Sequence, residues 1–459
     1  MQNAARPLSL GLTQAQLARF EGRVPRYTSY PTAPHFKPDI TADRYASWLA
    51  ALPEDQPVSL YLHIPFCQQL CWYCGCHTQV VRSDAPIRAY AEGLLAEIDL
   101  VADHIGRRLA VQEVHFGGGS PSLVPLDVLE QVMVRLRSRF DLNNVRDIAL
   151  EIDPRGVTPD QIQGFAALGL SRASIGVQDF DPHVQSVINR RQSFAETALV
   201  VAGLRAAGVK SINLDLIYGL PMQTLASIKR TVDLSLSLQP DRIALFGYAH
   251  VPWMKRHQAL IPAETLPAPL ERYGLYQAAA DHIAEAGYER VGLDHFAHPA
   301  DEMARQLRRG HVRRNFQGYT TDRAETLIGF GTSSIGALPQ GYLQNSLTVP
   351  DYRAALAERR LPIARGLALS DDDKLRRAVI ERLMCDLTVD LAAVAAQFGS
   401  AEDFLSERLA LTEFAPEGLV AVTGSVVTIR EAARPLVRSV AAVFDAYLSA
   451  GAGQYSQAV

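Results

Sequence analysis

The feature that most constrains the fold is a series of short apolar segments that alternate with stretches of helical periodicity. Six apolar segments, which we expect to be strands, are SLYLHIPF, EVHFGGGSPS, DIALEIDP, RASIGVQDF, SINLDLIYGLP and RIALFGYAH. Patterns typical of helices, such as IRAYAEGLLAEIDLVADHI and LDVLEQVMVRLRSRF, separate them. Strands that alternate with helices form parallel βα units. Between about residues 59 and 250 the sequence therefore predicts a partial (β/α)6 barrel of the TIM type.

Polar, thiol and glycine residues gather at the predicted strand ends, where barrels of this type carry their functional residues. The residues at these ends are Cys67, Gly117 to Ser120, Glu151, Gln178, Asp215 and Ala249. Packing alone does not explain chemically capable residues at six strand ends. A further segment, ERVGLDHFA, is expected to be a seventh strand that ends in Asp294 and His295.

The segments outside the barrel have a different character. Residues 1–55 contain RYTSYPTAPHF and are expected to form an irregular N-terminal arm, followed by the barrel at 56–300. A connecting segment at 301–364 leads to a mainly helical C-terminal domain at 365–459. The end of that domain is typical of a small hairpin followed by a helix, so we expect a winged-helix-like cap.

Composition and charge exclude several other classes of protein. The 459 residues carry a formal net charge of −4, which gives no reason to expect nucleic acid as a partner. No stretch of about 18 unbroken apolar residues occurs, so we expect no membrane span. The first twenty residues lack the apolar core of a secretory signal, and five cysteines are an odd count for disulfides. We therefore expect a cytoplasmic protein in a reducing compartment.

Four of the five cysteines lie in the ten residues CQQLCWYCGC, from Cys67 to Cys76. A redox pair needs only two thiols. Zinc remains an alternative, because His63 and His77 flank the run, although structural zinc sites separate their ligand pairs by a longer loop. Closely spaced thiols on one loop are typical of iron–sulfur clusters, and three ligands leave one iron of a cubane open. Cys385, in ERLMCDL, is instead expected to be a buried core residue.

The spacing C-x-x-x-C-x-x-C, with Tyr73 before the third cysteine, resembles that of the radical S-adenosylmethionine (SAM) enzymes. The stretches PRYTSYPT, CGCHT and VRRNFQGYTT, together with LEIDPR, GVQDF, NLDLIYGLP and YAHVP, resemble the oxygen-independent coproporphyrinogen III oxidases over essentially the whole chain. Ser120 stands where that family is expected to have threonine, and both side chains carry a hydroxyl. The resemblance does not explain the basic stretch RQLRRGHVRR.

The resemblance implies a set of site residues. It implies a [4Fe-4S] cluster held by Cys67, Cys71 and Cys74, and a further cysteine, Cys76, that is needed for activity without binding iron. Cluster-bound SAM would contact Tyr61, Gly118, Glu151 and Ile335, with Glu151 also counted as catalytic. A second SAM site would be formed by Tyr73, Gly119, Ser120, Gln178, Arg190, Asp215 and Ala249.

Several of these residues have a competing structural explanation. The glycine run HFGGGSP fits a backbone clamp on a ligand, but also a tight turn between strand and helix. Glu151 fits a ligand contact or a salt-bridged carboxylate at the rim. Arg190 fits a two-pronged contact with a ligand carboxylate, that of SAM or of a substrate propionate, or a solvated helix residue. Asp215 lies in an apolar strand, so we expect it to have a cationic or hydrogen-bonding partner.

For the basic run from Arg305 to Arg314 we expect a solvated face, with Arg314 alone as a candidate contact for a substrate propionate. Tyr30 and the rest of the arm are expected to cover the barrel mouth and to exclude water.

The implied reaction is the oxidative decarboxylation of two propionates of coproporphyrinogen III to vinyl groups, which gives protoporphyrinogen IX. It also implies a monomer and an electron donor such as a flavodoxin-type reductant. Two alternatives stay open: a haem-trafficking relative, whose pattern lacks the fourth cysteine and the RYTSYPT arm, and a non-enzymatic zinc module.

Overall fold

The computed structural model describes residues 11–20, 22–448 and 455. The first ten residues of the predicted arm, and most of the last eleven of the predicted C-terminal domain, lie outside the described residues. Contacts divide the chain into two compact units. The larger comprises His35–Leu266 and Asp322–Leu369, and the smaller the described residues of Met1–Pro34, Pro267–Thr321 and Ser370–Val459. These units regroup the predicted segments, since each draws on more than one of them.

The larger unit is built on a parallel sheet whose strands are those expected from the sequence. In spatial order they are β1 (Val58–Ile64), β4 (Val111–Gly118), β5 (Asp147–Ile152), β6 (Arg172–Gln178), β7 (Ser211–Tyr218) and β8 (Arg242–Gly247). Each pairs with the next in parallel. Near-continuous burial of β1, β4 and β7 is typical of strands covered on both faces. The predicted six βα units are therefore confirmed.

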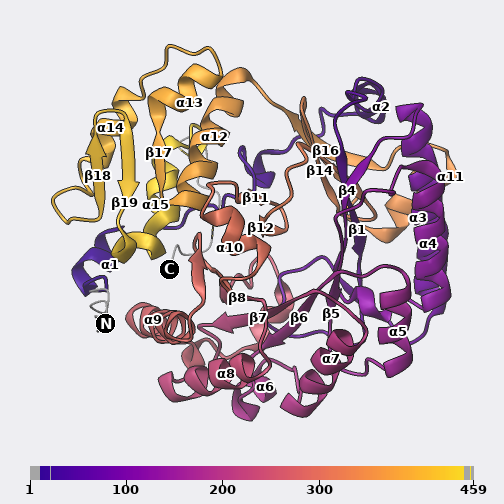
Figure 1. The fold of residues 1–459 in the computed structure, drawn as a ribbon, viewed down its shortest axis with the longest axis horizontal. Helices are drawn as coiled ribbons and strands as arrows, with labels where there is room; N and C mark the ends of the chain where they lie inside the picture. The colour runs from indigo at the N-terminus through magenta and orange to yellow at the C-terminus, as the bar shows by residue number, and fades with distance from the viewer. Residues whose placement is uncertain (1–10, 21, 449–454, 456–459) are drawn as a thin grey trace. The chain divides into compact units, whose positions relative to one another are not determined.

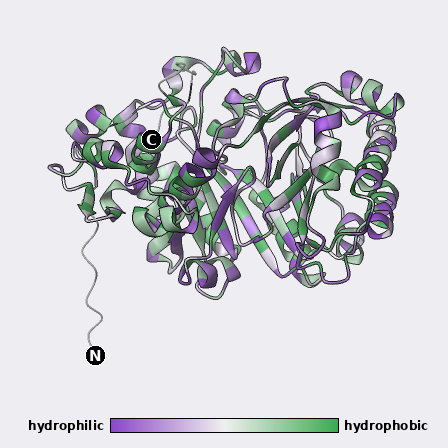
Figure 2. Ribbon diagram, turned by 90° about the horizontal axis from the view of Figure 1, so that it is seen from above, coloured by the Kyte–Doolittle hydropathy of each residue, from purple (hydrophilic) through white to green (hydrophobic). Residues whose placement is uncertain are grey.

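Helices follow the strands and cover the sheet (Figure 1). They are α3 (Ala85–Ile105), α4 (Leu126–Arg139), α5 (Pro159–Ala167), α6 (Pro182–Val187), α7 (Phe194–Ala206) and α8 (Leu225–Ser237). Reciprocal capping boxes begin α5, α7 and α8, which satisfies backbone donors that a helix start leaves open. Figure 2 shows hydrophobic residues along the strands and hydrophilic stretches on the outer helices.

The sheet continues beyond β1 with strands that the sequence did not predict. β13 (Thr326–Phe330) pairs in parallel with β1, and β14 (Ile335–Leu338), β15 (Gly341–Asn345) and β16 (Ile363–Ala368) extend it in antiparallel fashion. α11 (Val349–Ala357) connects the last two strands, and α2 (Ala42–Ala50) lies in the predicted irregular arm. The segment expected to be a connection therefore adds four strands to the sheet.

The smaller unit is mainly helical. Its helices are α1 (Gln14–Phe20), α9 (Pro269–Glu285), α10 (Glu302–Leu307), α12 (Asp371–Asp386), α13 (Leu391–Gln397), α14 (Leu405–Leu411) and α15 (Val437–Ala441). β11 (Arg313–Asn315) pairs with β12 (Gly318–Thr320), and β17 (Thr388–Asp390), β19 (Val426–Ile429) and β18 (Val420–Thr423) form a small sheet. The β18–β19 hairpin, followed by α15, confirms the hairpin and helix expected near the C-terminus.

The prediction of one seventh strand over ERVGLDHFA is wrong. The segment forms two short antiparallel strands, β9 (Glu289–Val291) and β10 (His295–Ala297). The chain reverses at Gly292, whose φ of 53° lies in the left-handed region that glycine adopts without steric cost.

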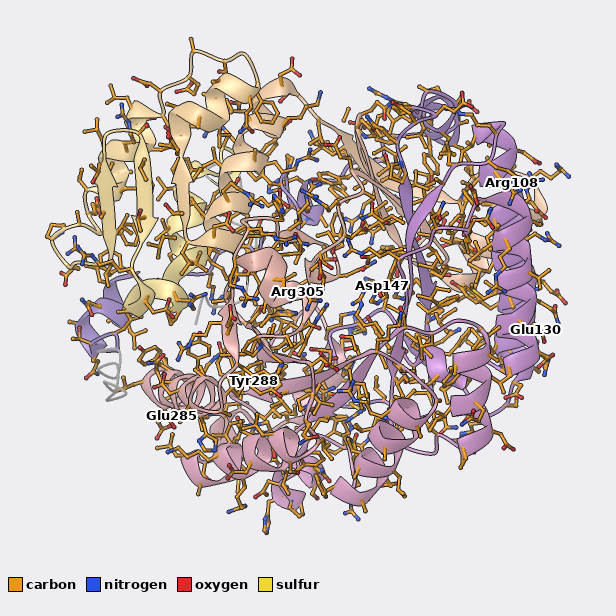
Figure 3. All side chains as sticks on the ribbon, in the orientation of Figure 1. Arg108, Glu130, Asp147, Glu285, Tyr288 and Arg305 are labelled. Atoms are coloured by element: carbon orange, nitrogen blue, oxygen red, sulfur yellow. The ribbon has the colours of Figure 1, made fainter. Side chains whose placement is uncertain are left out.

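The first arginines of the basic run lie at the surface. Arg305, labelled in Figure 3, is exposed and pairs with Glu302, and Arg308 pairs with Glu289 at the surface. Arg314 is half-buried. In the part of the chain that the structure describes, no helix is both long enough and apolar enough to cross a membrane.

Candidate functional site

The cysteine loop begins where β1 ends. Two short strands, β2 (Phe66–Cys67) and β3 (Gln79–Val80), pair in parallel and close the base of this loop. Backbone bonds from Gln79 N to Pro65 O, at 2.8 Å, and from Val81 N to Cys67 O, at 3.0 Å, complete the closure. The residues between them are thus held as one loop at the carboxyl end of the parallel sheet, where the barrel prediction put the functional residues.

Each of the three spaced thiols has its own polar partners. The Cys67 sulfur lies 3.0 Å from the Thr78 hydroxyl. Burial raises the pKa of this thiol, although the hydrogen bond with Thr78 lowers it. Cys71 accepts hydrogen bonds from two guanidinium groups, those of Arg190 at 3.6 Å and Arg155 at 3.8 Å. Cys74 accepts from the Cys76 backbone N–H at 3.4 Å.

Hydrogen bonding favours the anionic form of Cys74. A hydrogen bond from the Cys76 thiol is the largest cause that lowers the pKa of Cys74 to about 6. The two arginines place positive charge beside Cys71. Thiolates are the form that binds iron. Among the described residues, no three His, Cys, Asp or Glu side chains meet around a single ion site, but cluster thiolates bind different iron atoms. The donor set therefore fits an iron–sulfur cluster.

A segment after β8 holds the other side of the loop. Gln258 donates to the Tyr73 carbonyl at 2.9 Å, and Lys255 to the Cys76 carbonyl at 3.0 Å. His257 Nε2 lies 2.7 Å from the Cys74 carbonyl oxygen. Three side chains of one short segment thus bind three carbonyls of the loop, which fixes its backbone independently of any metal.

Replacing Gln258 by leucine is expected to lower the iron content of the reconstituted protein. Gln258 is buried, donates to the Tyr73 carbonyl, and accepts from Val251 N at 2.6 Å. The change leaves both backbone groups without partners, which costs about 2 kcal/mol. Iron and sulfide assays after anaerobic reconstitution test this, with Gln306→Leu in the smaller unit as the buried-glutamine control. Equal iron in both variants would contradict the assigned role.

The glycine run at the end of β4 passes directly beneath functional side chains. A Cβ at Gly117 would lie 2.7 Å from the Glu151 carboxylate, and one at Gly118 would lie 2.7 Å from the His63 ring. One at Gly119 would lie 2.6 Å from the Phe66 carbonyl oxygen. The protein's own packing therefore requires these glycines, whether or not a ligand also approaches them.

Glu151 lies at the end of β5 and is oriented by two donors. Gly118 N donates to Oε2 at 2.9 Å, and His115 Nε2 lies 3.3 Å from Oε1. Burial works to raise the pKa of Glu151, but the bond from His115 and the bond from Gly118 lower it overall. Glu151 is thus ionised at neutral pH and presents an acceptor at the strand ends.

Tyr61 and Ile335 flank the same region. The Tyr61 hydroxyl lies 3.0 Å from His63 Nδ1, and its ring centroid is 5.8 Å from that of His115. Ile335 begins β14, and a Cβ at Gly329 would lie 2.8 Å from the Ile335 carbonyl oxygen.

Ser120 lies beside the cysteine loop. Its backbone N–H donates to the Phe66 carbonyl at 2.7 Å, and its hydroxyl lies 3.6 Å from the Cys67 sulfur.

The remaining strand-end residues come from β6, β7 and β8. Gln178 ends β6 with a φ of 68°. Asp215 accepts from Asn213 at 2.7 Å and from Ser174 at 3.0 Å, which confirms the expected hydrogen-bonding partners. Ala249 follows β8 and is half-buried, and the Tyr73 ring packs against an apolar cluster that includes Val184.

Arg190 is buried and not solvated, so that alternative is wrong. Its guanidinium bonds Asp153 at 3.1 and 3.3 Å and the Gly176 carbonyl at 2.6 Å. Burial works to raise the pKa of Asp153, but Arg190 and Arg155 lower it. Arg190 thus makes a two-pronged contact with an internal carboxylate, and the expected contact with a carboxylate of SAM or of the substrate stays a prediction.

The two candidate substrate residues lie in the smaller unit. The Tyr30 hydroxyl accepts from Ala446 N at 3.0 Å, and its ring meets that of Tyr447 edge-on. Arg314 stacks on the Tyr319 ring at 4.4 Å and donates to the Arg26 carbonyl at 3.2 Å. Arg314 Nε and Nη1 are buried without a hydrogen-bonding partner. Their roles stay predictions.

Sequence reasoning missed the residues that position the site. These are Thr78, His115, Asp153, Arg155, Lys255, His257 and Gln258. Asp153 and Arg155 lie within LEIDPR, two and four residues after Glu151, so the same strand end could have singled them out. Residues 255–258, the segment after β8 whose side chains bind the cysteine loop, carry no recognisable sequence pattern.

Comparison with known proteins agrees with this geometry. The radical SAM superfamily matches residues 61–235, and the HemN C-terminal domain matches residues 369–436. The chain is 50% identical to "Oxygen-independent coproporphyrinogen III oxidase" from Bradyrhizobium diazoefficiens, over 96% of this chain and 98% of that one. It is 43% identical to the protein of that name from Paracoccus denitrificans, with the same shares covered. These names do not favour the haem-carrying alternative.

A solved structure is similar over nearly the same length. It is described as "Coproporphyrinogen III oxidase (HemN) from Escherichia coli is a Radical SAM enzyme", with a TM-score of 0.87 and 35% identity. The match covers 93% of this chain and all of that one. Half of the residues are shared with one relative along almost the full length, so the chain belongs to the oxygen-independent coproporphyrinogen III oxidases of the radical SAM superfamily.

Proposed function

We propose that this chain oxidatively decarboxylates two propionates of coproporphyrinogen III to vinyl groups and so forms protoporphyrinogen IX. The observation that carries the proposal is the loop with three spaced thiols, two of them beside arginine or hydroxyl donors, in a chain 50% identical to a relative named for this activity. When bound, a [4Fe-4S] cluster and SAM supply the one-electron chemistry that removes a hydrogen atom from the substrate.

The chain's own residues bind and orient these groups. Cys67, Cys71 and Cys74 hold the cluster and leave one iron for SAM. Glu151, held by Gly118 N–H and His115, accepts hydrogen bonds from the SAM amine or ribose. Tyr61, Gly118 and Ile335 are the other proposed contacts of this SAM.

A second SAM pocket is proposed at the neighbouring strand ends. Its residues are Tyr73, Gly119, Ser120, Gln178, Arg190, Asp215 and Ala249. The Asp215 carboxylate is held in place by hydrogen bonds from Ser174 and Asn213. Its oxygens can accept further bonds, which supports binding of a ligand with donor groups at this position. Arg314, with two unpartnered N–H donors, is the proposed propionate contact, and Tyr30 a proposed neighbour. We further propose a cytoplasmic monomer that receives electrons from a flavodoxin-type reductant.

The decisive experiment is anaerobic turnover of coproporphyrinogen III with reconstituted protein, SAM and a reductant. Two molecules of carbon dioxide per porphyrinogen are expected from the two propionates. Cleavage of SAM with the porphyrinogen left intact would refute the substrate. Tight stoichiometric binding of added haem, without carbon dioxide, would favour the haem carrier.

Replacing Cys76 by serine is expected to leave the iron content unchanged and to abolish release of carbon dioxide. Cys76 is exposed, and its backbone N–H donates to Cys74 while its carbonyl accepts from Lys255. Its thiol also donates a hydrogen bond to Cys74. Serine keeps those backbone contacts and offers a hydroxyl donor to Cys74 in place of the thiol. Iron assays and carbon dioxide release, measured on the same sample, test the two parts, and loss of iron would make Cys76 a ligand.

A further inference from the structure

Glu97, on α3, is a buried carboxylate that none of the steps above uses. Its side chain is 1% exposed. Oε1 accepts from Asn345 Nδ2 at 2.6 Å, and Oε2 accepts from Gly331 N at 2.7 Å and from the Tyr352 hydroxyl at 2.6 Å. Burial raises its pKa to about 7, against these three hydrogen bonds. All three partners are neutral donors, so Glu97 lacks the cation that usually accompanies a buried carboxylate.

These bonds hold the turn at residues 331–334, between β13 and β14. Asn345 Nδ2 also donates to the Gly331 carbonyl at 2.9 Å, and Thr332 N donates to the Tyr90 hydroxyl at 2.9 Å. Gly331 has a φ of 92°, and a Cβ there would collide with the Tyr90 hydroxyl. Two side chains of α3, Glu97 and Tyr90, therefore fix the backbone of this turn.

The same helix also reaches the end of β1. The Tyr90 hydroxyl donates to the His63 carbonyl at 2.7 Å. The His63 ring lies 3.0 Å from the Tyr61 hydroxyl through Nδ1, and 3.0 Å from the His77 carbonyl through Nε2. Ile335 follows the turn directly. α3 is thus bonded to both segments that carry Tyr61 and Ile335.

We propose that Glu97 is a positioning residue for SAM, which sets the place of Ile335 by fixing the turn at 331–334. The inference rests on the proposed function, because Tyr61 and Ile335 are SAM contacts only within it.

The chemistry of the three donors explains why the residue is a carboxylate. Three donors point at the Glu97 side chain: Gly331 N–H, the Tyr352 hydroxyl and the Asn345 amide. Only a carboxylate offers an accepting oxygen at both terminal positions of this side chain. An amide would face one of these donors with its own N–H₂. In one orientation of that amide the buried Asn345 side chain loses its acceptor on residue 97, and in the other Gly331 N–H and the Tyr352 hydroxyl lose theirs.

The test compares Glu97→Gln with Glu113→Gln, both in reconstituted protein of equal iron content. Glu113 on β4 is a matched control, because it is also buried with a pKa raised by burial to about 7, but it pairs with Arg172 at 3.4 Å. Equilibrium dialysis gives the SAM affinity, and hydrogen exchange gives the protection of the amides at 331–335. We expect Glu97→Gln to bind SAM about tenfold more weakly and to exchange faster at Gly331, with SAM affinity unchanged in Glu113→Gln.

Tyr352→Phe removes one donor and keeps the carboxylate, so it serves if Glu97→Gln does not fold. We expect about threefold weaker SAM binding from it. Unchanged SAM affinity with faster exchange at the turn overturns the inference and leaves the proposed function standing. An equal loss of affinity in Glu113→Gln would also overturn it, as a general effect of stability. A wild-type protein that binds no SAM would overturn both.

Discussion

Replacing Cys71 by alanine is expected to give a folded protein that holds no intact cluster and cleaves no SAM. Cys71 is the buried thiol of the loop and is bonded by Arg155 and Arg190. A cubane with three protein ligands has no spare thiolate, and Cys76 is exposed and held through its backbone to Cys74. Because the cofactor carries the chemistry, activity is lost completely and not merely reduced.

The control for this loss is Cys385→Ala. Cys385 is buried in the smaller unit among apolar residues that include Met303 and Tyr319, and burial raises the pKa of its thiol. Its loss leaves a small cavity, so we expect a lower melting temperature with full iron content. Absorbance of the reconstituted cluster, iron assays and SAM cleavage distinguish the two variants. A Cys71→Ala protein with normal iron and SAM cleavage would remove Cys71 from the ligand set.

The barrel strands were predictable because each is a continuous apolar run followed by a helix. β13 to β16 escaped prediction for a different reason. TLIGF and IGAL are short, and each is interrupted by a glycine. TLIGF pairs with β1, which lies far away in the chain, and IGAL pairs with TLIGF. Local patterns do not contain such long-range pairing. The hairpin at Gly292 shows the same limit, since one backbone reversal turned an expected strand into two.

In the site, spacing predicted the thiols because three cysteines on one loop are rare without a metal. The partners of those thiols were not predictable. His115 and Glu151 come from different strands, and Arg190 meets Asp153 from another βα unit. Only the fold brings them together. The sequence suggested a ligand carboxylate as the partner of Arg190, whereas the structure pairs it with the internal carboxylate of Asp153.

The ion pair between Arg190 and Asp153 makes the stability of the protein depend on pH in the acid range. Arg190 and Arg155 hold the pKa of Asp153 below its usual value near 3.8, against burial. Ionised Asp153 therefore adds stability that is fully present above about pH 4 and is lost as the pH falls through the depressed pKa. Removing Arg190 should weaken this acid-dependent part, as measured by urea unfolding across the range below pH 5.

Replacing Arg190 by methionine is expected to lower the free energy of unfolding by about 3 kcal/mol and to weaken SAM-dependent activity strongly. Arg190 is 5% exposed, and its loss leaves the Gly176 carbonyl without its donor and Asp153 with Arg155 alone. Arg205→Met is the control, because Arg205 pairs with Asp241 near the surface and should cost less than about 1 kcal/mol. Arg190→Lys separates charge from geometry: lysine keeps the positive charge but cannot bond both Asp153 oxygens and Gly176 in one plane. Full activity in Arg190→Lys would mean that charge alone matters. Activity as low as that of Arg190→Met would assign the effect to the planar guanidinium group, which bonds Cys71, Asp153 and Gly176 together.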